Sequence, residues 1–369
     1  MFIIATVTND LTYDQRMIRI CTSLQQAGHE VLLVGRKRAS SVPLVERVFQ
    51  QKRLHCWMDK GKGFYVEYNI RLFLFLLFQR VDVICSVDLD TILPGLVVSR
   101  IRGKVVVYDA HEYFTEVPEV VRRPSVKRIW EWVARWAIPR LRYCYTVGPA
   151  LAKLFTERYG TPFGVVRNVP YLQEMAIPVA NFEKKVVLYQ GALNEGRGLE
   201  CAIEAMGYLE GVELWLAGEG DLSEKLRDLV QELGVSQKVR FLGYIQPEQL
   251  KAVTLEASVG LNILENVGLS YYYSLANKAF DYIQAGLPTI QIAFPEYQAL
   301  QQQYNTFIML EELQPEALAQ TIEATFADKV TYLKLRQNCL DARTQLCWEK
   351  EVEALLQVYE TIQATIARP

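Results

Sequence analysis

The chain has 369 residues, and its 40 lysines and arginines nearly balance 42 aspartates and glutamates, giving a formal net charge of −2. This length suits about two domains, and the near-neutral charge gives no reason to expect nucleic acid as a partner. The seven cysteines are odd in number, scattered and never in a Cys-x-x-Cys pair, a pattern that argues against a disulfide or zinc framework and favours reduced thiols.

The chain opens with an apolar stretch, residues 2–7, that has no basic segment before it and no small-residue cleavage site after it. It is therefore expected to form a strand and not a signal peptide. The longest uninterrupted apolar run, residues 72–78, is far shorter than the roughly 20 residues that span a bilayer. We expect a cytoplasmic protein that is either soluble or peripheral on the inner face of the cytoplasmic membrane.

Short β-rich apolar stretches alternate with longer helical patterns along both halves of the chain, and this rhythm predicts parallel sheets covered by helices. The rhythm stops near Pro170 and Pro178 and resumes at about residue 184. The prediction is two Rossmann-like, doubly wound domains, 1–170 and 184–349, facing a central cleft that holds the site. The predicted strands are residues 2–7, 30–35, 81–85, 104–110, 143–148 and 163–168, then 185–191, 212–218, 238–244, 258–264, 288–293 and 307–310.

The first strand is followed by a polar turn that contains Asn9, Asp10, Asp14 and Arg16. It has no Gly-x-Gly-x-x-Gly pattern, which argues against a nicotinamide or flavin dehydrogenase, because the cofactor's pyrophosphate normally rests on that turn. One interpretation is a pocket that binds the hydroxyl groups of an acceptor. A capped helix start with a polar outer face is the alternative.

The strand at 104–110 ends with Asp109 and runs into His111 and Glu112. His111 is one of only three histidines, and it sits where the carboxyl end of a strand is expected to face the cleft. It is predicted either to contact substrate or to be a satisfied structural histidine. Asp109 is expected to orient it.

Residues 121–142 hold seven basic residues, one acid and three of the six tryptophans. A basic helix with aromatic residues can lie in a membrane interface and attract anionic lipid. The alternative is a helix packed on the core with solvated arginines.

The predicted strand at 185–191 leads into a glycine-rich turn from Gly191 to Gly198 and then into a helix. Glycines let the backbone approach a phosphate, the helix N-terminus offers free N–H groups, and Arg197 can bind a diphosphate through two hydrogen bonds. The turn is interpreted as an anion site, with an ordinary glycine-softened chain reversal as the alternative.

A second glycine turn, containing Gly218 and Glu219, follows the next strand and is assigned first to architecture and second to lining the donor site. Asp221 and Ser223 are expected to cap the helix after it.

A third group of polar residues lies between Glu265 and Gly286, where a loop leads into a helix carrying Asn277, Lys278 and Asp281. The helix can present a cation and a carboxylate to the cleft, and a carboxylate suits a ribose diol because it accepts hydrogen bonds from both hydroxyls. The alternative is a surface lysine and an acid favoured by the helix dipole. The final segment, about 350–369, is predicted to be an amphipathic helix that packs on the first domain.

Taken together, these segments resemble glycosyltransferase family 4, a group of retaining GT-B enzymes, over nearly the whole chain. The stretches LYQGALNEGRGLECAIEAM, LWLAGEGDLSEKLRDLVQELGVSQKVRFLGYI and NKAFDYIQAGLPTI resemble the family's donor-binding half, and VVYDAHEYF and TYDQRMIRICTSLQQAGHEV resemble its acceptor half. The resemblance implies a metal-independent transferase that needs no cofactor and moves a sugar from a nucleotide-sugar to a glycan or lipid-linked acceptor. Polysaccharide or lipopolysaccharide assembly is the implied setting.

Carried over by residue, the resemblance implies that Arg197 contacts the donor diphosphate, Asp281 binds the donor ribose and His111 contacts the transferred sugar. Two positions depart from the family pattern. Ala192 stands where the family has arginine, and Lys278 is expected to replace that cation. Counting back from Asp281 in the family's E-x7-E signature places Tyr273 at the first acid, so either Glu265 takes this role across an insertion or the first acid is absent.

The implied sites are therefore three. The catalytic residues are His111, Arg197 and Lys278; the donor site has Gly191, Arg197, Gly218, Glu219, Glu265, Asn277, Lys278 and Asp281; the acceptor side has Asp10, Asp14, Arg16, Asp109 and Glu112. No metal ligands are predicted, because no His, Asp or Cys cluster has ligand spacing. The alternatives are a GT-B nucleotide-sugar epimerase and a catalytically silent GT-B scaffold.

Overall fold

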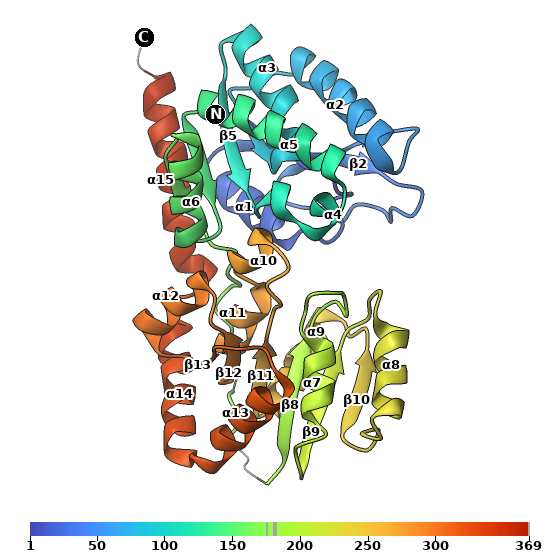
Figure 1. The fold of residues 1–369 in the computed structure, drawn as a ribbon. Coiled ribbons are helices and arrows are strands. Elements are labelled where there is room, and N and C mark those ends of the chain that lie inside the picture. The colour runs from blue at the N-terminus through green and yellow to red at the C-terminus, as the bar shows by residue number, and fades with distance from the viewer. Residues whose placement is uncertain (175, 180–182, 368–369) are drawn as a thin grey trace. The chain divides into compact units, whose positions relative to one another are not determined.

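The computed structural model describes residues 1–174, 176–179 and 183–367. Two compact units divide the chain: Met1–Asn168 with Glu349–Pro369, and Val169–Trp348 (Figure 1). Residues 368–369 of the predicted last helix, and residues 175 and 180–182 between the predicted domains, lie outside the described residues.

The first unit contains a seven-stranded parallel sheet in the order β3-β2-β1-β4-β5-β6-β7. Six of its strands were predicted from their apolar runs, and the seventh, β3, was not. Its residues alternate between exposed and half-buried positions at the edge of the sheet, so it lacks the apolar run of a buried strand. The strands are β1 (Phe2–Thr6), β2 (Glu30–Lys37), β3 (Gln50–His55), β4 (Val83–Val87), β5 (Val105–Ala110), β6 (Tyr143–Thr146) and β7 (Phe163–Val165).

Helices cover this sheet, and their apolar sides supply the core beneath them. The α2 side chains Phe64, Tyr68, Leu72 and Leu76 pack with strand residues such as Ile84. The last helix, α15, belongs to this unit, and its Tyr143–Thr365 side-chain hydrogen bond (3.0 Å) ties it to β6. The helices are α1 (Gln15–Gln26), α2 (Gly61–Phe78), α3 (Ile92–Arg102), α4 (Pro118–Val121), α5 (Pro124–Ala137), α6 (Pro149–Tyr159) and α15 (Trp348–Ile366), with short 3-10 turns η1 (Leu89–Thr91), η2 (Phe114–Glu116) and η3 (Ile138–Arg140).

The second unit contains a six-stranded parallel sheet in the order β10-β9-β8-β11-β12-β13. In both sheets the order reverses direction beside the first strand of the unit, which is the arrangement of a doubly wound fold. All six strands match predicted stretches. They are β8 (Lys185–Gln190), β9 (Val212–Ala217), β10 (Val239–Gly243), β11 (Val259–Asn262), β12 (Thr289–Ile292) and β13 (Phe307–Leu310).

Two apolar clusters in this unit show that helices cover both faces of the sheet. Val187 and Tyr189 of β8 point into one cluster, while Val186 and Leu188 point into the other, as the two-residue period of a strand requires. The helices are α7 (Leu199–Ala205), α8 (Ser223–Glu232), α9 (Pro247–Glu256), α10 (Leu269–Tyr272), α11 (Asn277–Gln284), α12 (Pro295–Tyr304), α13 (Pro315–Ala327) and α14 (Lys329–Ala342).

Among the described residues, no helix combines the length and the apolar character that crossing a bilayer requires.

Candidate functional site

In the first unit, β5 brings ionisable side chains to the carboxyl edge of the sheet. Asp109 is fully buried, and its Oδ1 accepts a hydrogen bond from Arg16 at 2.8 Å. Its Oδ2 lies 3.1 Å from His111 Nε2. Arg16 is also buried and donates to the carbonyl oxygen of Val166 at 2.9 Å. The next residue, Glu112, is exposed.

The charges in this cluster shift the pKa values of Asp109 and His111. Burial acts to raise the pKa of Asp109, but the positive charges of Arg16 and His111 outweigh it and lower the pKa to about 2. Burial acts to lower the pKa of His111, but the Asp109 and Asp88 carboxylates outweigh it and raise the pKa to about 9. At neutral pH His111 is therefore an imidazolium with two N–H donors, and its side chain is 22% exposed.

Two further acids, neither of them a predicted site residue, complete this cluster. Asp88 follows β4 with φ of 54°, and its Oδ1 accepts a hydrogen bond from the His111 backbone N–H at 2.8 Å. Burial raises the pKa of Asp88. Asp90 accepts a 2.6 Å hydrogen bond from Thr8, and burial raises its pKa to about 7. Part of the signal was available, because Asp88 and Asp90 come within five residues of the end of the strand predicted at 81–85, and the carboxyl ends of parallel strands meet at one edge of a sheet.

The polar turn after β1 is held by its own hydrogen bonds. Asp14 is the N-cap of α1 and accepts from the Met17 backbone N–H at 3.0 Å. Asp10 accepts from Ser41 Oγ at 2.9 Å. Of the acceptor-side residues predicted on this turn, the structure brings Arg16 to the Asp109 and His111 cluster and leaves Asp10 and Asp14 in the turn. Within the described part of the chain, no group of three or more His, Cys, Asp or Glu side chains is placed to hold a metal ion.

In the second unit, glycine turns at the carboxyl ends of neighbouring strands pack backbone against backbone. Gly218, after β9, has φ of 151°, and a Cβ added there would lie 1.9 Å from the Gly191 carbonyl oxygen. Gly198 has φ of 70°, and its Cβ would lie 2.1 Å from the Ile263 carbonyl oxygen. Only glycine fits either position, so the turn from Gly191 to Gly198 is held against β9 and β11.

Two cationic side chains lie at this turn. Lys278 Nζ is buried, lies 3.6 Å from the centroid of the Tyr189 ring, and has no hydrogen-bond partner among the described residues. Burial, reinforced by the charge of Arg197, holds the pKa of Lys278 well below its usual range. The Arg197 guanidinium lies 5.0 Å from the centroid of the Tyr271 ring. The Asp281 carboxylate acts in the opposite direction, but burial outweighs it. A buried amine without a hydrogen-bond partner is costly to ionise, so a bound anion at this turn would favour the ammonium form.

Glu265 lies at the same turn, and its backbone N–H donates to the Gly196 carbonyl oxygen at 3.0 Å. Burial, together with the negative charge of Glu200, raises the pKa of Glu265. Tyr273 comes after α10, where its backbone N–H bonds to the carbonyl of Leu269. Helix α10 therefore separates Glu265 from Tyr273 along the chain.

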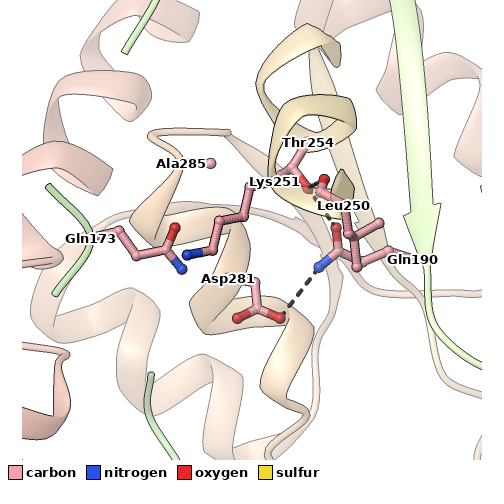
Figure 2. Close-up of a pocket in the computed structure, with 7 residues that line it drawn as sticks. All are labelled: Gln173, Gln190, Leu250, Lys251, Thr254, Asp281 and Ala285. Atoms are coloured by element: carbon pink, nitrogen blue, oxygen red, sulfur yellow. Dashed lines mark hydrogen bonds between the residues drawn. The ribbon is translucent and has the colours of Figure 1, made fainter. Parts of the chain in front are cut away.

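The other predicted donor-site residues lie at neighbouring positions of this edge. Glu219 is exposed and forms a 3.0 Å ion pair with Arg227 of α8. Asn277 is the exposed first residue of α11. Asp281, one turn further along α11, faces a pocket between α11 and α9 (Figure 2).

This pocket of about 140 Å³ lies beside the end of β8. Gln190 Nε2 donates to Asp281 Oδ2 at 3.3 Å, and Gln190 Oε1 accepts from Thr254 Oγ1 at 2.9 Å (Figure 2). Of the residues that line this pocket, Asp281 was a predicted site residue and the others were not. The pocket is lined by Gln173, Gln190, Leu250, Lys251, Thr254, Asp281 and Ala285.

Family models of glycosyltransferases match both halves of the chain. Residues 15–170 match the family model described as Glycosyltransferase Family 4, and residues 173–343 match glycosyl transferases group 1. The lipopolysaccharide core biosynthesis glycosyltransferase LpsE of Rhizobium meliloti is 28% identical over 152 residues, which are 41% of this chain and 42% of that protein. Alignments with the curated relatives span 27 to 42% of those proteins' own lengths.

Solved structures resemble the whole chain. Sucrose-phosphate synthase from Thermosynechococcus elongatus has a TM-score of 0.82 at 17% identity, covering 99% of this chain and all of that one. The Anabaena protein Alr3699/HepE, in complex with UDP and glucose, has a TM-score of 0.75 at 13% identity, with 98% and 99% covered. Together with the family matches, these likenesses confirm the predicted fold class, two parallel-sheet α/β domains of the GT-B type.

Proposed function

We propose that this chain, which belongs to the GT-B glycosyltransferases, transfers a sugar with retention from a nucleotide-sugar donor to a glycan or lipid-linked acceptor. The observation that carries this proposal is the Lys278 amine, which is buried beside the glycine turn of the second unit and has no hydrogen-bond partner among the described residues. A donor diphosphate at this turn would supply the missing hydrogen-bond partner and a negative charge that favours the ammonium form of Lys278. Arg197 and Lys278 would then stabilise the negative charge that grows on the leaving nucleoside diphosphate.

The pocket at Asp281 is proposed to hold the donor ribose. Its carboxylate lines the pocket beside β8, and it can accept hydrogen bonds from two vicinal hydroxyls. HepE, one of the proteins with the same fold, was solved with UDP and glucose, which makes a uridine nucleotide the first donor to test. Glu265 is proposed as the first acid of the signature, because it contacts the glycine turn and α10 forms an insertion between it and Tyr273.

In the first unit, His111 is proposed to donate hydrogen bonds to a sugar. Its imidazolium is held between Asp109 and Asp88, yet its side chain is 22% exposed. Arg16 and Asp109 are buried, so they act as positioning residues for His111. Glu112, which is exposed, and Asp10 are proposed to lie on the acceptor side.

The transfer is proposed to need neither a metal ion nor a cofactor. Support comes from the two cations, which can take the role that a divalent ion has for other phosphates.

The cellular setting is proposed to be lipopolysaccharide or polysaccharide assembly on the inner face of the cytoplasmic membrane. Support comes from the likeness to LpsE and from α5 within the basic segment 121–142, where Arg128, Trp132 and Arg135 are exposed. Such a face can contact an anionic lipid surface.

The test is turnover of UDP-, GDP- and ADP-sugars with a metal chelator present. Slow hydrolysis of each donor is monitored by NMR. We expect one donor to be turned over, the first-formed sugar to keep its anomeric configuration, and Arg197→Ala to lose at least about tenfold in rate. Arg240→Ala is the control, because Arg240 is an exposed arginine already paired with Glu213. Binding without turnover would favour a silent scaffold, and inversion would refute retention.

A further inference from the structure

Helix α2 is apolar on both of its faces, although one face is exposed. Phe64, Tyr68, Leu72 and Leu76 are at most 4% exposed and pack on the sheet. The opposite side carries Val66, Ile70, Leu74 and Phe78, which are 60, 55, 49 and 79% exposed and follow one another at four-residue spacing. We call these four residues the α2 stripe. A helix that is apolar on all sides is normally buried on all sides, so we expect a binding partner to cover this stripe.

The α2 stripe is part of a larger surface formed by three neighbouring helices. Helices α2 and α3 lie side by side, and α5 lies against them (Figure 1). Tyr65 of α2 contacts Trp130 of α5, with ring centroids 5.5 Å apart. An apolar groove of about 210 Å³ runs between α2 and α3 and is lined by Asn69, Ile70, Phe73, Leu93, Pro94 and Val97.

The charges on these three helices have one sign at the surface. Every residue of α2, α3 and α5 is described, and none of the exposed ones is an acid. The two acids that the helices carry, Glu67 and Glu131, are half-buried and lie against Arg71 and Arg135. The exposed charged residues are Lys62, Arg100, Arg128 and Arg135.

An ordinary outer helix of the same protein looks different. The exposed residues of α8 are Glu224, Lys225, Asp228, Gln231 and Glu232, which mix both signs and include no large apolar side chain. The α2, α3 and α5 surface thus combines apolar side chains with exposed charged residues that are all basic, which is the composition of helices that bind anionic membranes.

We propose that the α2 stripe inserts into the interface of an anionic bilayer, with the exposed arginines of α3 and α5 on the lipid headgroups. The proposal rests on the proposed function for the choice of a membrane as partner, and it assigns the apolar anchor to α2 instead of segment 121–142. A second copy of this chain is a poorer occupant. A symmetric contact would bring Arg100, Arg128 and Arg135 of both copies together with no exposed acid on these helices to pair with them.

The test is co-sedimentation of the full chain with vesicles of phosphatidylcholine, alone or mixed with phosphatidylglycerol. We expect binding to the mixed vesicles only, and a loss of about tenfold or more for Leu74→Glu, because the variant removes an inserted side chain and adds a like charge to the lipid. Leu333→Glu is the matched control, since Leu333 on α14 in the second unit is also 49% exposed. It should bind as wild type does.

Measurements at low and high salt separate the electrostatic contribution to vesicle binding from the contribution of the inserted apolar side chains. Arg128→Glu should weaken binding about fivefold at low salt and less at high salt, because headgroup attraction is screened. The Leu74→Glu loss should persist at high salt. Equal binding by Leu74→Glu and Leu333→Glu would overturn the inference for α2 while leaving membrane contact through α5 intact.

Failure of the wild-type chain to bind mixed vesicles would overturn the membrane as partner. Light scattering on the same variants tests whether a second copy of the chain covers the α2 stripe. A wild-type dimer that Leu74→Glu converts to a monomer would show that it does. No proposed donor-site or catalytic residue lies on α2, so donor turnover should be unchanged in Leu74→Glu. A protein that binds vesicles but turns over no donor would therefore refute the transferase proposal alone.

Discussion

At the scale of single residues, buried ionisable groups differ in whether the fold supplies a hydrogen-bond partner. Lys278 is a buried amine with no hydrogen-bonding partner among the described residues, whereas Arg16 and Asp109 satisfy each other in a buried pair. The missing partner of Lys278 favours the binding of a ligand, whereas the Arg16–Asp109 pair favours a rigid local structure. A single Arg or Lys in the sequence cannot reveal which of the two it will be, because the difference lies in what the fold places beside it.

The depressed pKa of Lys278 predicts that nucleotide binding takes up a proton. Burial lowers this pKa in the free protein, and a bound diphosphate would raise it again by supplying a negative charge. Calorimetric titration of UDP in buffers of different ionisation enthalpy should show proton uptake near neutral pH, and Lys278→Met should abolish it. Uptake that persists in Lys278→Met would assign the proton to another group.

The raised pKa of His111 predicts a stability contribution that depends on pH. Its folded value of about 9 lies above the ordinary value of 6.5. The contribution is therefore complete below about pH 6.5 and is lost as the pH rises through about 9. In urea unfolding, the loss of stability caused by His111→Asn should shrink by about 1 to 3 kcal/mol between these limits. A difference that is constant or grows with pH would contradict the ion pairing.

At the scale of elements, strands with an apolar run were predictable even at a sheet edge, as β7, β10 and β13 show, whereas the polar edge strand β3 and the cap of α8 were not. All the strands except β3 follow from their apolar runs. The expected cap of α8 is wrong: the helix begins at Ser223 after Leu222, with no side-chain cap, and Ser223 Oγ instead accepts from the Gly220 N–H at 2.9 Å. Capping depends on the angle at which the chain enters the helix, and the close packing of the glycine turns fixes that angle here.

The packing of those turns gives a prediction for Gly218. An alanine Cβ there would lie 1.9 Å from a backbone oxygen, so Gly218→Ala should destabilise the protein by about 2 to 4 kcal/mol and weaken nucleotide binding. Gly211→Ala is the control, because Gly211 has φ of 67° but open space around its Cβ position. It should cost only about 1 kcal/mol and leave binding unchanged. Equal losses of stability would show that the backbone angle alone is responsible.

At the scale of the whole molecule, the chain builds two parallel α/β units, each with its polar residues at the carboxyl edge of its own sheet. That edge was predictable from the motifs, because each one follows a strand. What the sequence did not reveal is the set of neighbours from distant segments: Asp88 beside His111, Gln190 beside Asp281, and Tyr189 beneath Lys278. These contacts follow from strand order, which local patterns leave undetermined.

The most direct test of the central claim is calorimetric binding of UDP, GDP and ADP, with metal chelated, to wild type and to Arg197→Ala/Lys278→Met. The account predicts that one nucleotide binds the wild type and that the double variant binds it at least about a hundredfold more weakly, since two charge-assisted contacts are lost. Unaltered affinity in the double variant, or no binding of any nucleotide to the wild type, would contradict the claim that this turn is a donor diphosphate site.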